Sequence, residues 1–388
     1  MEEYLIDEES LQQIARAVRD KAGITDDMTP KEIMEQIYLL ETPTDVGAPA
    51  HGVFFYDYDG TLLYSYTVKE ARALTALPDP PTHDGLPSAG WTHTLEEVKS
   101  TLKYLDVGAM YDPPSTKIVM DISDDNTTIT LRLKAYGTSD DGAAPSTIIN
   151  WGDGTTQTIS NPEMHNSEIG IYSHTYATSG TYTIEFVIES GTLYLGQYRA
   201  TMLITGDNYD SVRKMVKSVI IAKNTYIGQC AFRDCDNLES IIVGLGIKWI
   251  TSEDLYSTGN LKFVVLPTSV TGLRSCAFQY CDVLTKVIMP AVQYINEWAF
   301  YGCENLERII IPSSIASIGD KAFYNNDNLR EIHVRSKTPP SFGDEVFGFT
   351  LSNTIISRRI YVPQESVDLY KTTTGWSSYR GIITGEPV

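Results

Sequence analysis

The sequence predicts a multidomain, mainly β protein whose C-terminal half is a solenoid of repeats. One short phrase recurs between about residue 216 and residue 362 at steps of 22 to 24 residues, and self-similarity at such a period indicates a repeat architecture. Short apolar segments separated by turn residues occupy 117–205, as in an antiparallel β-sandwich. A helical pattern of apolar residues occupies 7–40.

The repeats are defined by columns of apolar residues. Four segments align on an anchor residue: YIGQCAFRDCDNL, GLRSCAFQYCDVL, YINEWAFYGCENL and SIGDKAFYNNDNL. The anchor column holds Phe232, Leu255, Phe278, Phe300, Phe323 and Phe347. Two more columns are predicted to be interior, five residues before and six residues after the anchor: Ile227, Ile250, Leu273, Ile295, Ile318 and Phe342, then Leu238, Leu261, Leu284, Leu306 and Leu329.

Each repeat also predicts one short strand. After the leucine, apolar residues alternate, as in Ile241 and Val243, which indicates a strand with one buried face. Each repeat is too small to bury its apolar face alone, so stacking on neighbouring repeats must stabilise it. We predict that the solenoid spans 213–365 and that 366–388 form a C-terminal cap over its last open face.

The repeat phrase resembles the BspA-like leucine-rich repeat of bacterial surface and phage proteins. Its pattern Leu-x-x-Ile-x-Ile-Pro, followed by Ile-Gly-x-x-Ala-Phe-x-x-Cys-x-x-Leu, is matched over about 150 residues. The second repeat departs from it, with Asp254 and Leu255 in place of Ala-Phe. The resemblance implies a stacked leucine-rich repeat solenoid and gives precedent for adhesion at a cell surface.

All five cysteines lie inside the repeats. Cys235, Cys281 and Cys303 share the column three residues after the anchor, where we expect small buried side chains. Cys230 and Cys276 share a column with charged residues, so we expect them to be partly exposed. Adjacent turns lie about 4.8 Å apart, which would permit a disulfide between Cys281 and Cys303, but free thiols are the favoured interpretation.

Charge and composition exclude several classes of function. Fifty acidic against thirty basic residues give a net charge of −20, which repels phosphate backbones, so nucleic acid is not expected as a partner. The start MEEYLIDEES lacks a basic region followed by an apolar one, and no apolar stretch is long enough to span a bilayer. We therefore expect neither a conventional secretory substrate nor membrane insertion.

Residues 1–42 predict an amphipathic helical hairpin. Gly23 ends the first helix and Thr29-Pro30 begins the second. The segment LQQIARAVRDKAGITDDMTPKEIMEQI resembles an N-terminal segment of phage and prophage tail-associated proteins of gut bacteria. Because so short a segment cannot fold alone, we expect its apolar face to attach to another protein. The predicted attachment face is Leu11, Ile14, Val18, Ile33 and Ile37.

Residues 50–112 predict a small module of strands and helix. Two strands flank Asp59-Gly60, a strong hairpin signal, and a helix is predicted over 94–105. The letters FFYDYDGTLL also resemble the nucleophile motif of haloacid-dehalogenase-like phosphotransferases, which would make Asp57 the nucleophile and Asp59 the acid/base. That chemistry needs further strands carrying a Ser/Thr, a Lys and an acidic pair, whereas a proline-rich stretch follows, so this enzyme hypothesis is a remote one.

Residues 115–206 predict a β-sandwich with strands over 118–122, 128–135, 148–151, 156–159, 181–188 and 198–204. The segments INWGDGTTQTI and YSHTYATSGTYTIEFVI resemble a PKD domain, an immunoglobulin-like module. The resemblance implies that Trp151 packs in the core, that Asp153 caps backbone amides, and that the domain is a spacer or interaction module. The acidic residues Asp121, Asp124 and Asp125 have no spaced ligand loop for calcium and are interpreted as a solvated turn.

No constellation for catalysis or metal binding emerges, and no cofactor is expected.

The column after the anchors holds Arg233, Tyr256, Gln279, Tyr301 and Tyr324, which should point outward by alternation with the buried anchor. Tyrosine gives contact area at low entropic cost. With Trp249 these residues suggest a binding strip, although they could equally be a cover for that side of the solenoid. The candidate binding residues are Tyr256, Tyr280, Trp298, Tyr301 and Tyr324.

These observations predict a non-enzymatic structural and receptor-binding protein. The resemblances imply a phage tail or virion-associated protein, made in the host cytoplasm, whose N-terminus docks onto other virion proteins and whose solenoid contacts a glycan or protein of the host surface. The alternative is an extracellular bacterial cell-surface adhesin, for which a signal peptide or wall anchor would be expected. A homo-oligomer is compatible with the sequence, but no coiled-coil heptads enforce one.

Overall fold

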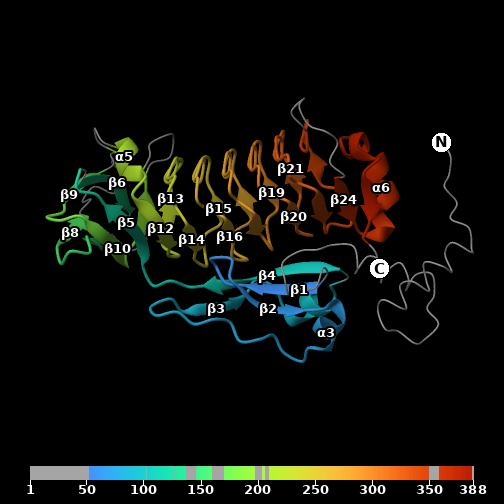
Figure 1. Cartoon of the computed structure of the whole chain (residues 1–388), viewed down its shortest axis with the longest axis horizontal. Helices are drawn as coiled ribbons and strands as arrows, with labels where there is room; N and C mark the ends of the chain where they lie inside the picture. The colour runs from blue at the N-terminus through green and yellow to red at the C-terminus, as the bar shows by residue number, and fades with distance from the viewer. Residues whose placement is uncertain are drawn as a thin grey trace, which may run out of the picture.

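The computed structural model describes residues 52–386 except positions 102 and 126 and the segments 137–145, 160–169, 197–202, 206–208 and 349–357. The predicted helical hairpin and its attachment face, Leu11 to Ile37, lie outside the described residues. The described part is mainly β, with a small sheet, two larger packed sheets and the solenoid arranged as in Figure 1. None of its helices combines the length and the apolar character that crossing a bilayer requires.

The first unit, called the module here, covers residues 52–111. Its sheet has the order β2-β1-β4-β3, built from β1 (Gly52–Tyr56), β2 (Leu62–Tyr66), β3 (Ser88–Trp91) and β4 (Tyr104–Tyr111). The antiparallel pairing of β1 with β2 confirms the predicted hairpin. Two short helices, α3 (Val68–Ala73) and α4 (Leu95–Lys99), each begin with a Thr-x-x-Glu capping box.

The helix predicted over 94–105 is wrong in its extent. The capping box of Thr94 and Glu97 does start a helix, but α4 ends at Lys99 and β4 begins at Tyr104. All eight residues of β4 are buried, and β4 pairs with both β1 and β3. A run buried on both faces shows no alternation, so the sequence pattern could not distinguish a central strand from a continuing helix.

Two further sheets follow and share one core. Their strands are β5 (Thr116–Ile122), β6 (Thr128–Tyr136), β7 (Ser146–Asn150), β8 (Thr156–Ile159), β9 (Gly170–Thr175), β10 (Gly180–Ser190) and β11 (Thr192–Leu195). Five of the predicted strands are present, β9 and β11 were not predicted, and most of 198–204 lies outside the described residues. Trp151 is 1% exposed, and Asp153 accepts hydrogen bonds from the Thr155 amide and hydroxyl, as the PKD resemblance implied.

The hydrophobic core does not divide at the boundary predicted near residue 206. After α5 (Tyr209–Arg213), strand β12 (Val216–Ile221) pairs antiparallel with β5 and parallel with β14 (Ser240–Val243). On the other sheet, β11 pairs parallel with β13 (Thr225–Ile227). One buried cluster therefore runs from Ile118 in the two-sheet unit to Ile383 at the end of the solenoid, and the two-sheet unit covers the first turn.

The solenoid has three sides (Figure 1). Long strands form one side: β14, β16 (Phe263–Val265), β18 (Lys286–Ile288), β20 (Arg308–Ile311), β22 (Glu331–Val334) and β24 (Arg359–Val362). Short strands form a second: β13, β15 (Trp249–Ile250), β17 (Gly272–Leu273), β19 (Tyr294–Ile295), β21 (Ser317–Ile318) and β23 (Ser341–Phe342). The third side consists of turns that carry the anchors, called the outer turns here.

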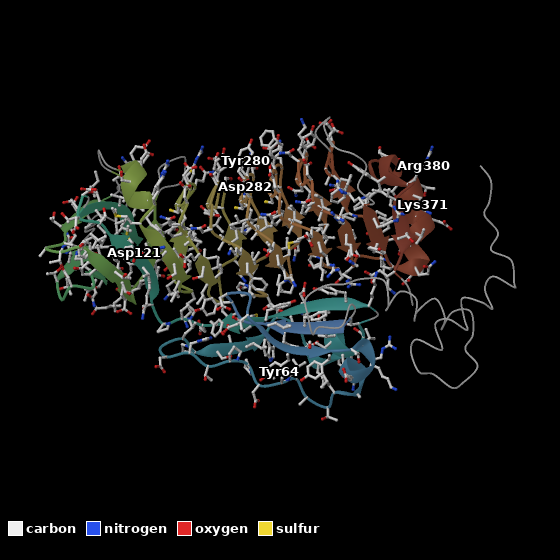
Figure 2. The ribbon with its side chains drawn as sticks, in the orientation of Figure 1. Tyr64, Asp121, Tyr280, Asp282, Lys371 and Arg380 are labelled. Carbon is white, nitrogen blue, oxygen red and sulfur yellow. The ribbon has the colours of Figure 1, made fainter. Side chains whose placement is uncertain are left out.

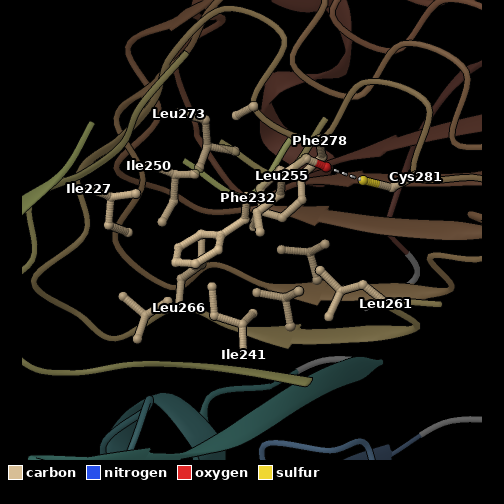
Figure 3. Close-up of a cluster of buried hydrophobic side chains, with 14 of the residues drawn as sticks. Ile227, Phe232, Ile241, Ile250, Leu255, Leu261, Leu266, Leu273, Phe278 and Cys281 are labelled. Carbon is tan, nitrogen blue, oxygen red and sulfur yellow. Dashed lines mark hydrogen bonds between the residues drawn. The ribbon is translucent and has the colours of Figure 1, made fainter. Parts of the chain in front are cut away.

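The predicted interior columns are confirmed. All six anchors and all five leucines are at most 1% exposed, and only Phe342 in the remaining column is half-buried. The rings of Phe278, Phe300 and Phe323 stack with centroids 5.1 Å apart, and Phe347 follows at 5.5 Å. Figure 3 shows Phe232, Leu255 and Phe278 meeting residues from both kinds of strand in the interior.

The C-terminal residues form the predicted cap. They contain η1 (Gln364–Ser366), α6 (Val367–Thr372), η2 (Trp376–Tyr379) and β25 (Ile383–Gly385), which pairs with β24. Tyr370 and Trp376 are fully buried, and the Trp376 indole donates to the Pro340 carbonyl at 3.0 Å. The last repeat therefore buries its apolar face against this cap instead of another turn.

The alternation of apolar residues predicted that each long strand buries only one face. This is wrong for the long strands that the module covers. The intervening residues are buried as well, at 4 to 6% exposed, because the module lies against the outside of this sheet: Ile242, Phe263, Val265 and Ile288. Tyr56 packs on Phe263 with ring centroids 5.4 Å apart. Gly108 is in such close contact that a Cβ there would lie 2.5 Å from Val265 Cγ1.

All five cysteines are free thiols. Cys281 Sγ donates to the Leu255 carbonyl at 2.9 Å (Figure 3), and Cys303 Sγ donates to the Phe278 carbonyl at 3.1 Å. Each buried thiol thus satisfies a carbonyl of an earlier turn, and burial raises the pKa of Cys281 to about 11. The expected partial exposure holds for Cys276 but is wrong for Cys230, which is buried beside Glu253.

The weakest repeat provides a pH test of stability. Asp254 occupies the column that holds alanine in four other turns, is 1% exposed, and accepts hydrogen bonds from the Thr251 amide and hydroxyl. Burial raises its pKa from 3.8 to about 7. The folded state therefore holds this proton more tightly than the unfolded state, and the stabilisation present below pH 3.8 is lost as the pH rises through about 7.

We expect Asp254→Asn, which keeps an acceptor oxygen but cannot titrate, to remove this loss. Between pH 5 and pH 8 the free energy of unfolding of the wild type should fall, relative to the variant, by roughly 2–3 kcal/mol. Urea unfolding at both pH values measures the difference. A parallel pH dependence in the two proteins would contradict the assignment of a raised pKa to Asp254.

A second test concerns the packing of the module. In Gly108→Val the new side chain would meet Val265, so the module should separate partly from the solenoid, and overpacking should destabilise the contact by about 1–3 kcal/mol. Small-angle scattering should show a larger radius of gyration. Gly381→Val is the matched control because a Cβ at Gly381 meets no atom within 4 Å. Identical radii for the two variants would contradict this contact.

Candidate functional site: a tyrosine ladder on the outer turns

The outer turns have a backbone that most residues avoid. In all six turns the residue two positions before the anchor has positive φ, and in the first five turns so does the residue two positions after it. The later position holds Asp234, Ser257, Gly302 and Asn325 in four of the turns. Most of these are residues that tolerate the left-handed region. At this later position the exception is Tyr280, whose φ is 60° and whose large side chain is disfavoured in the left-handed region.

Four tyrosines form a ladder across successive outer turns. Tyr256 contacts Tyr280, Tyr280 contacts Tyr301, and Tyr301 stacks on Tyr324, with ring centroids 5.5 Å apart in each pair. We call this set, Tyr256, Tyr280, Tyr301 and Tyr324, the tyrosine ladder. It continues at one end into the Arg233 guanidinium, which lies 4.3 Å from the Tyr256 ring centroid. Figure 2 shows Tyr280 on the side of the solenoid that faces away from the module.

Glycines in the following turn make room for two of these rings. A Cβ on Gly302 would lie 2.8 Å from Cδ1 of Tyr280, and a Cβ on Gly348 would lie 2.4 Å from Cδ2 of Tyr324. Each ring therefore lies against bare backbone of its neighbour. Because aromatic pairs contribute about 0.5–1.5 kcal/mol beyond their buried area, the ladder also supports the stacking of the turns.

The ladder presents neutral phenol groups. Burial raises the pKa of Tyr256 and of Tyr301 above the usual value of 10, so these hydroxyls stay protonated at physiological pH. Tyr280 has 39% of its surface exposed, and the other three rings are half-buried. Such a surface offers aromatic faces together with hydroxyls that donate and accept hydrogen bonds, which suits noncovalent recognition.

The structure brings together four of the five predicted binding residues. Trp298 is 39% exposed but stands outside the ladder, at the left-handed position that precedes the anchor Phe300. Trp249, which the sequence suggested as part of the same strip, lies instead on the short-strand side. There it stacks on Tyr294 with centroids 6.0 Å apart, and Arg274 lies 4.4 Å from its ring centroid. Its position directly before Ile250 places it on the short strand β15, and the sequence contains this signal.

The long-strand side is not available to a ligand over the area that the module covers. Lys286 Nζ donates to the hydroxyls of Tyr56 and Tyr104 at 2.7 and 3.1 Å and pairs with Asp106 at 3.0 Å. Buried His333 contacts Glu386 at 2.9 Å beside the stacked ring of Tyr104. The module is therefore held on the long-strand side by buried polar contacts as well as by apolar ones. The outer turns and the short-strand side are not covered by the module.

Asp57 connects the β1–β2 hairpin to other parts of the module through hydrogen bonds. Its carboxylate accepts hydrogen bonds from the Tyr111 hydroxyl at 2.5 Å and the Tyr58 amide at 2.7 Å, and it lies 2.8 Å from His83 Nε2. Asp59 accepts only a turn bond from the Thr61 amide at 2.9 Å among the contacts described. Both carboxylate oxygens of Asp57 thus have protein partners. The sequence Asp57-Tyr58-Asp59-Gly60 is therefore explained by its role in the turn, and Asp57 is not an open nucleophile.

Among the described residues, no group of three or more His, Cys, Asp or Glu side chains has an arrangement that could hold a metal ion. The predicted solvated turn holds for Asp124 and Asp125, which are exposed in the turn after β5. It is wrong for Asp121, which lies within β5, accepts a hydrogen bond from the Thr181 hydroxyl at 2.6 Å and lies 3.7 Å from Lys217.

The spacing and burial of the repeats can now be compared with known families. The family described as "BspA type Leucine rich repeat region (6 copies)" matches residues 207–330 and 248–366. The match spans residues 207–366, which is less than half of the 388-residue chain, and we call these residues the BspA-type region. No curated protein matches the chain.

Several solved structures are similar to the BspA-type region over part of their length. A leucine-rich repeat protein from Bacteroides ovatus is 19% identical, with 60% of this chain and 59% of that one covered and a TM-score of 0.35. The T. pallidum leucine-rich repeat protein is 25% identical, with 38% and 64% covered and a TM-score of 0.28. The pneumococcal vaccine antigen PcpA is 14% identical, with 50% and 44% covered and a TM-score of 0.28. The chain thus spans less than two thirds of each, and TM-scores this low carry no activity or partner over from them.

The contact between the ladder and the glycines can be tested directly. Gly302→Ala should destabilise the protein through its positive φ, by about 1–2 kcal/mol, and additionally through displacement of the Tyr280 ring. Gly154→Ala is the matched control, because Gly154 also has positive φ but meets no neighbouring atom. Urea unfolding gives both costs, and NMR of labelled tyrosine detects the ring shift. Equal costs and unchanged ring signals would contradict the ladder geometry.

Proposed function

We propose that this protein is a non-enzymatic attachment protein that contacts a host cell surface through the outer turns of its BspA-type region. The observation that carries the proposal is the tyrosine ladder, and above all Tyr280. The local backbone disfavours a tyrosine at a φ of 60°, and other turns hold Asp, Ser, Gly or Asn there. A residue that costs backbone energy and stays 39% exposed is better explained by recognition than by coverage of the core.

The arrangement of the other parts supports the same proposal. The module covers the long-strand side and the two ends carry caps, so the ladder faces outward on a side that nothing else in the described chain covers. Aromatic side chains are enriched where proteins bind one another because they bury large area with few rotatable bonds. The partner of this surface would be a protein or glycan of the host cell.

We further propose that the protein is carried on a phage tail or virion. The support is the sequence of residues 1–42, with its amphipathic face and its resemblance to phage tail-associated segments. The alternative is a bacterial cell-surface adhesin, which the BspA-type family favours because its members include bacterial surface proteins. Both assignments share the same recognition surface and differ in what the N-terminal segment holds.

The recognition surface is tested by cell binding. Fluorescently labelled full-length protein should bind at least one strain in a panel of gut bacteria, and the double variant Tyr256→Ala/Tyr301→Ala should bind at least tenfold more weakly. Tyr64→Ala is the matched control, since Tyr64 is 38% exposed on the module. Binding that the double variant retains in full, or no binding to any strain, would count against the proposal.

The carrier is tested separately. An antibody against residues 52–386, used in immunoelectron microscopy of producing cells and of the particles they release, should label the particles. Label confined to the cell envelope would overturn the virion assignment and favour the adhesin.

A further inference from the structure

The short-strand side of the solenoid contains an open groove that the proposed function does not use. Its volume is about 520 Å³, within the range of about 300–1,000 Å³ typical of small-molecule sites. It crosses β19, β21 and β23 at their C-terminal ends, where their residues and those just after them form its walls. The tyrosine ladder contributes no residue to its lining.

The groove exists because side chains become small along two columns. In the column just after the short strands, Thr251 and Arg274 are followed by Asn296, Gly319 and Gly343. In the column one residue before the interior residues, Tyr226, Trp249, Gly272 and Tyr294 are followed by Ser317 and Ser341. Gly319 also packs closely on the preceding turn: a Cβ there would lie 2.5 Å from the Glu297 amide nitrogen, so only glycine permits this approach of the two backbones.

An aromatic side chain stands at one end of the groove. The strand register pairs Tyr294 with Ser317 and Ser317 with Ser341, so Tyr294 neighbours Ser317, and Ser341 lies one strand further on. Tyr294 therefore stands at the edge of the groove and is not one of its lining residues. Tyr294 is 40% exposed and is held from behind by the stacked indole of Trp249, which itself lies over Gly272. Trp298, also 39% exposed, follows the groove residue Glu297 in the chain.

The polar lining favours one class of ligand. It consists of the hydroxyls of Ser275, Ser317 and Ser341, the Asn296 amide, and the carboxylates of Glu297 and Asp320. No cationic side chain lines the groove in the part of the chain that the structure describes. Carboxylates and amides bind neighbouring hydroxyls of a ligand, whereas the two negative charges, in a protein of net charge −20, repel anions.

We propose that this groove binds a neutral oligosaccharide, with one sugar ring packed on Tyr294 and its hydroxyls bonded to Asn296, Glu297 and Asp320. An aromatic face beside hydroxyl, amide and carboxylate groups matches a sugar, which is apolar on its ring face and polar at its rim. Sialylated and uronic-acid glycans are excluded by the carboxylates. The site goes beyond the proposed attachment surface and does not depend on it.

The test uses the full-length protein and isothermal titration with defined sugars. The probes are neutral hexamers of glucose, mannose and galactose and the hexamer of N-acetylglucosamine, with hexagalacturonate and sialyllactose as anionic comparisons. At least one neutral hexamer should bind with a Kd below about 1 mM, and the anionic sugars should bind at least tenfold more weakly.

Three variants locate the binding in the groove. Tyr294→Ala should weaken binding of the neutral sugar at least tenfold, and Ser317→Leu, which fills the groove from a half-buried position, should do the same. Tyr226→Ala is the matched control because Tyr226 belongs to the same column and is 58% exposed several turns away. Circular dichroism and unfolding curves confirm that each variant folds, and Asn296→Ala provides a fourth readout independent of the aromatic ring.

The outcomes separate this proposal from the attachment function. Loss of sugar binding in Tyr294→Ala together with normal cell binding supports the groove as a distinct site. No binding of any neutral hexamer, equal binding of anionic sugars, or binding that Tyr294→Ala and Ser317→Leu leave unchanged would overturn it, whatever the ladder variants do.

Discussion

The structure depends on the stacking of each repeat on the next. A single turn has no core of its own. The anchor rings from Phe278 to Phe347 lie 5.1 to 5.5 Å from their neighbours, and the buried thiols of Cys281 and Cys303 each donate to a carbonyl of an earlier turn. Burying one such side chain contributes about 1.5–3 kcal/mol, but only if neighbours stand on both sides. The two ends of the stack must therefore be covered. The two-sheet unit does this at the start by extending both its sheets into the first turns, and Tyr370 and Trp376 do it at the end.

The same requirement explains the position of the module. The long strands carry apolar side chains on both faces, so their outer face would be an exposed apolar surface if left alone. The module covers it with Tyr56 and Gly108, and Lys286 satisfies buried hydroxyls and the Asp106 carboxylate at the contact. Coverage of one side leaves the other two sides accessible, where the ladder and the groove lie.

Glycine permits close contact between turns on both exposed sides. On the outer turns, Gly302 and Gly348 let tyrosine rings lie close against the next turn, so a continuous aromatic surface results. On the short-strand side, Gly319 and Gly343 let the backbones of successive turns approach closely and form part of the groove lining. In both places the repeat pattern of the core is unchanged. Only the columns that face outward vary, which is how one solenoid can hold two different surfaces.

The sequence by itself determined the stack and its interior. A fixed period with apolar residues in fixed columns has only one way to bury them, so the anchors, leucines and cap were predictable, and the tyrosines after the anchors had to face outward.

The sequence did not determine what contacts the outside of the long strands, because Phe263, Val265 and Ile288 resemble ordinary strand residues until the module is placed on them. The sequence analysis also placed Trp249 on the wrong side of the solenoid. The position of a residue in the repeat indicates whether it points inward or outward, but not on which of the three sides it lies. The extent of β4, the shared core near residue 206 and the groove beside Tyr294 were decided by tertiary structure, because each arises from contacts between segments far apart in the chain.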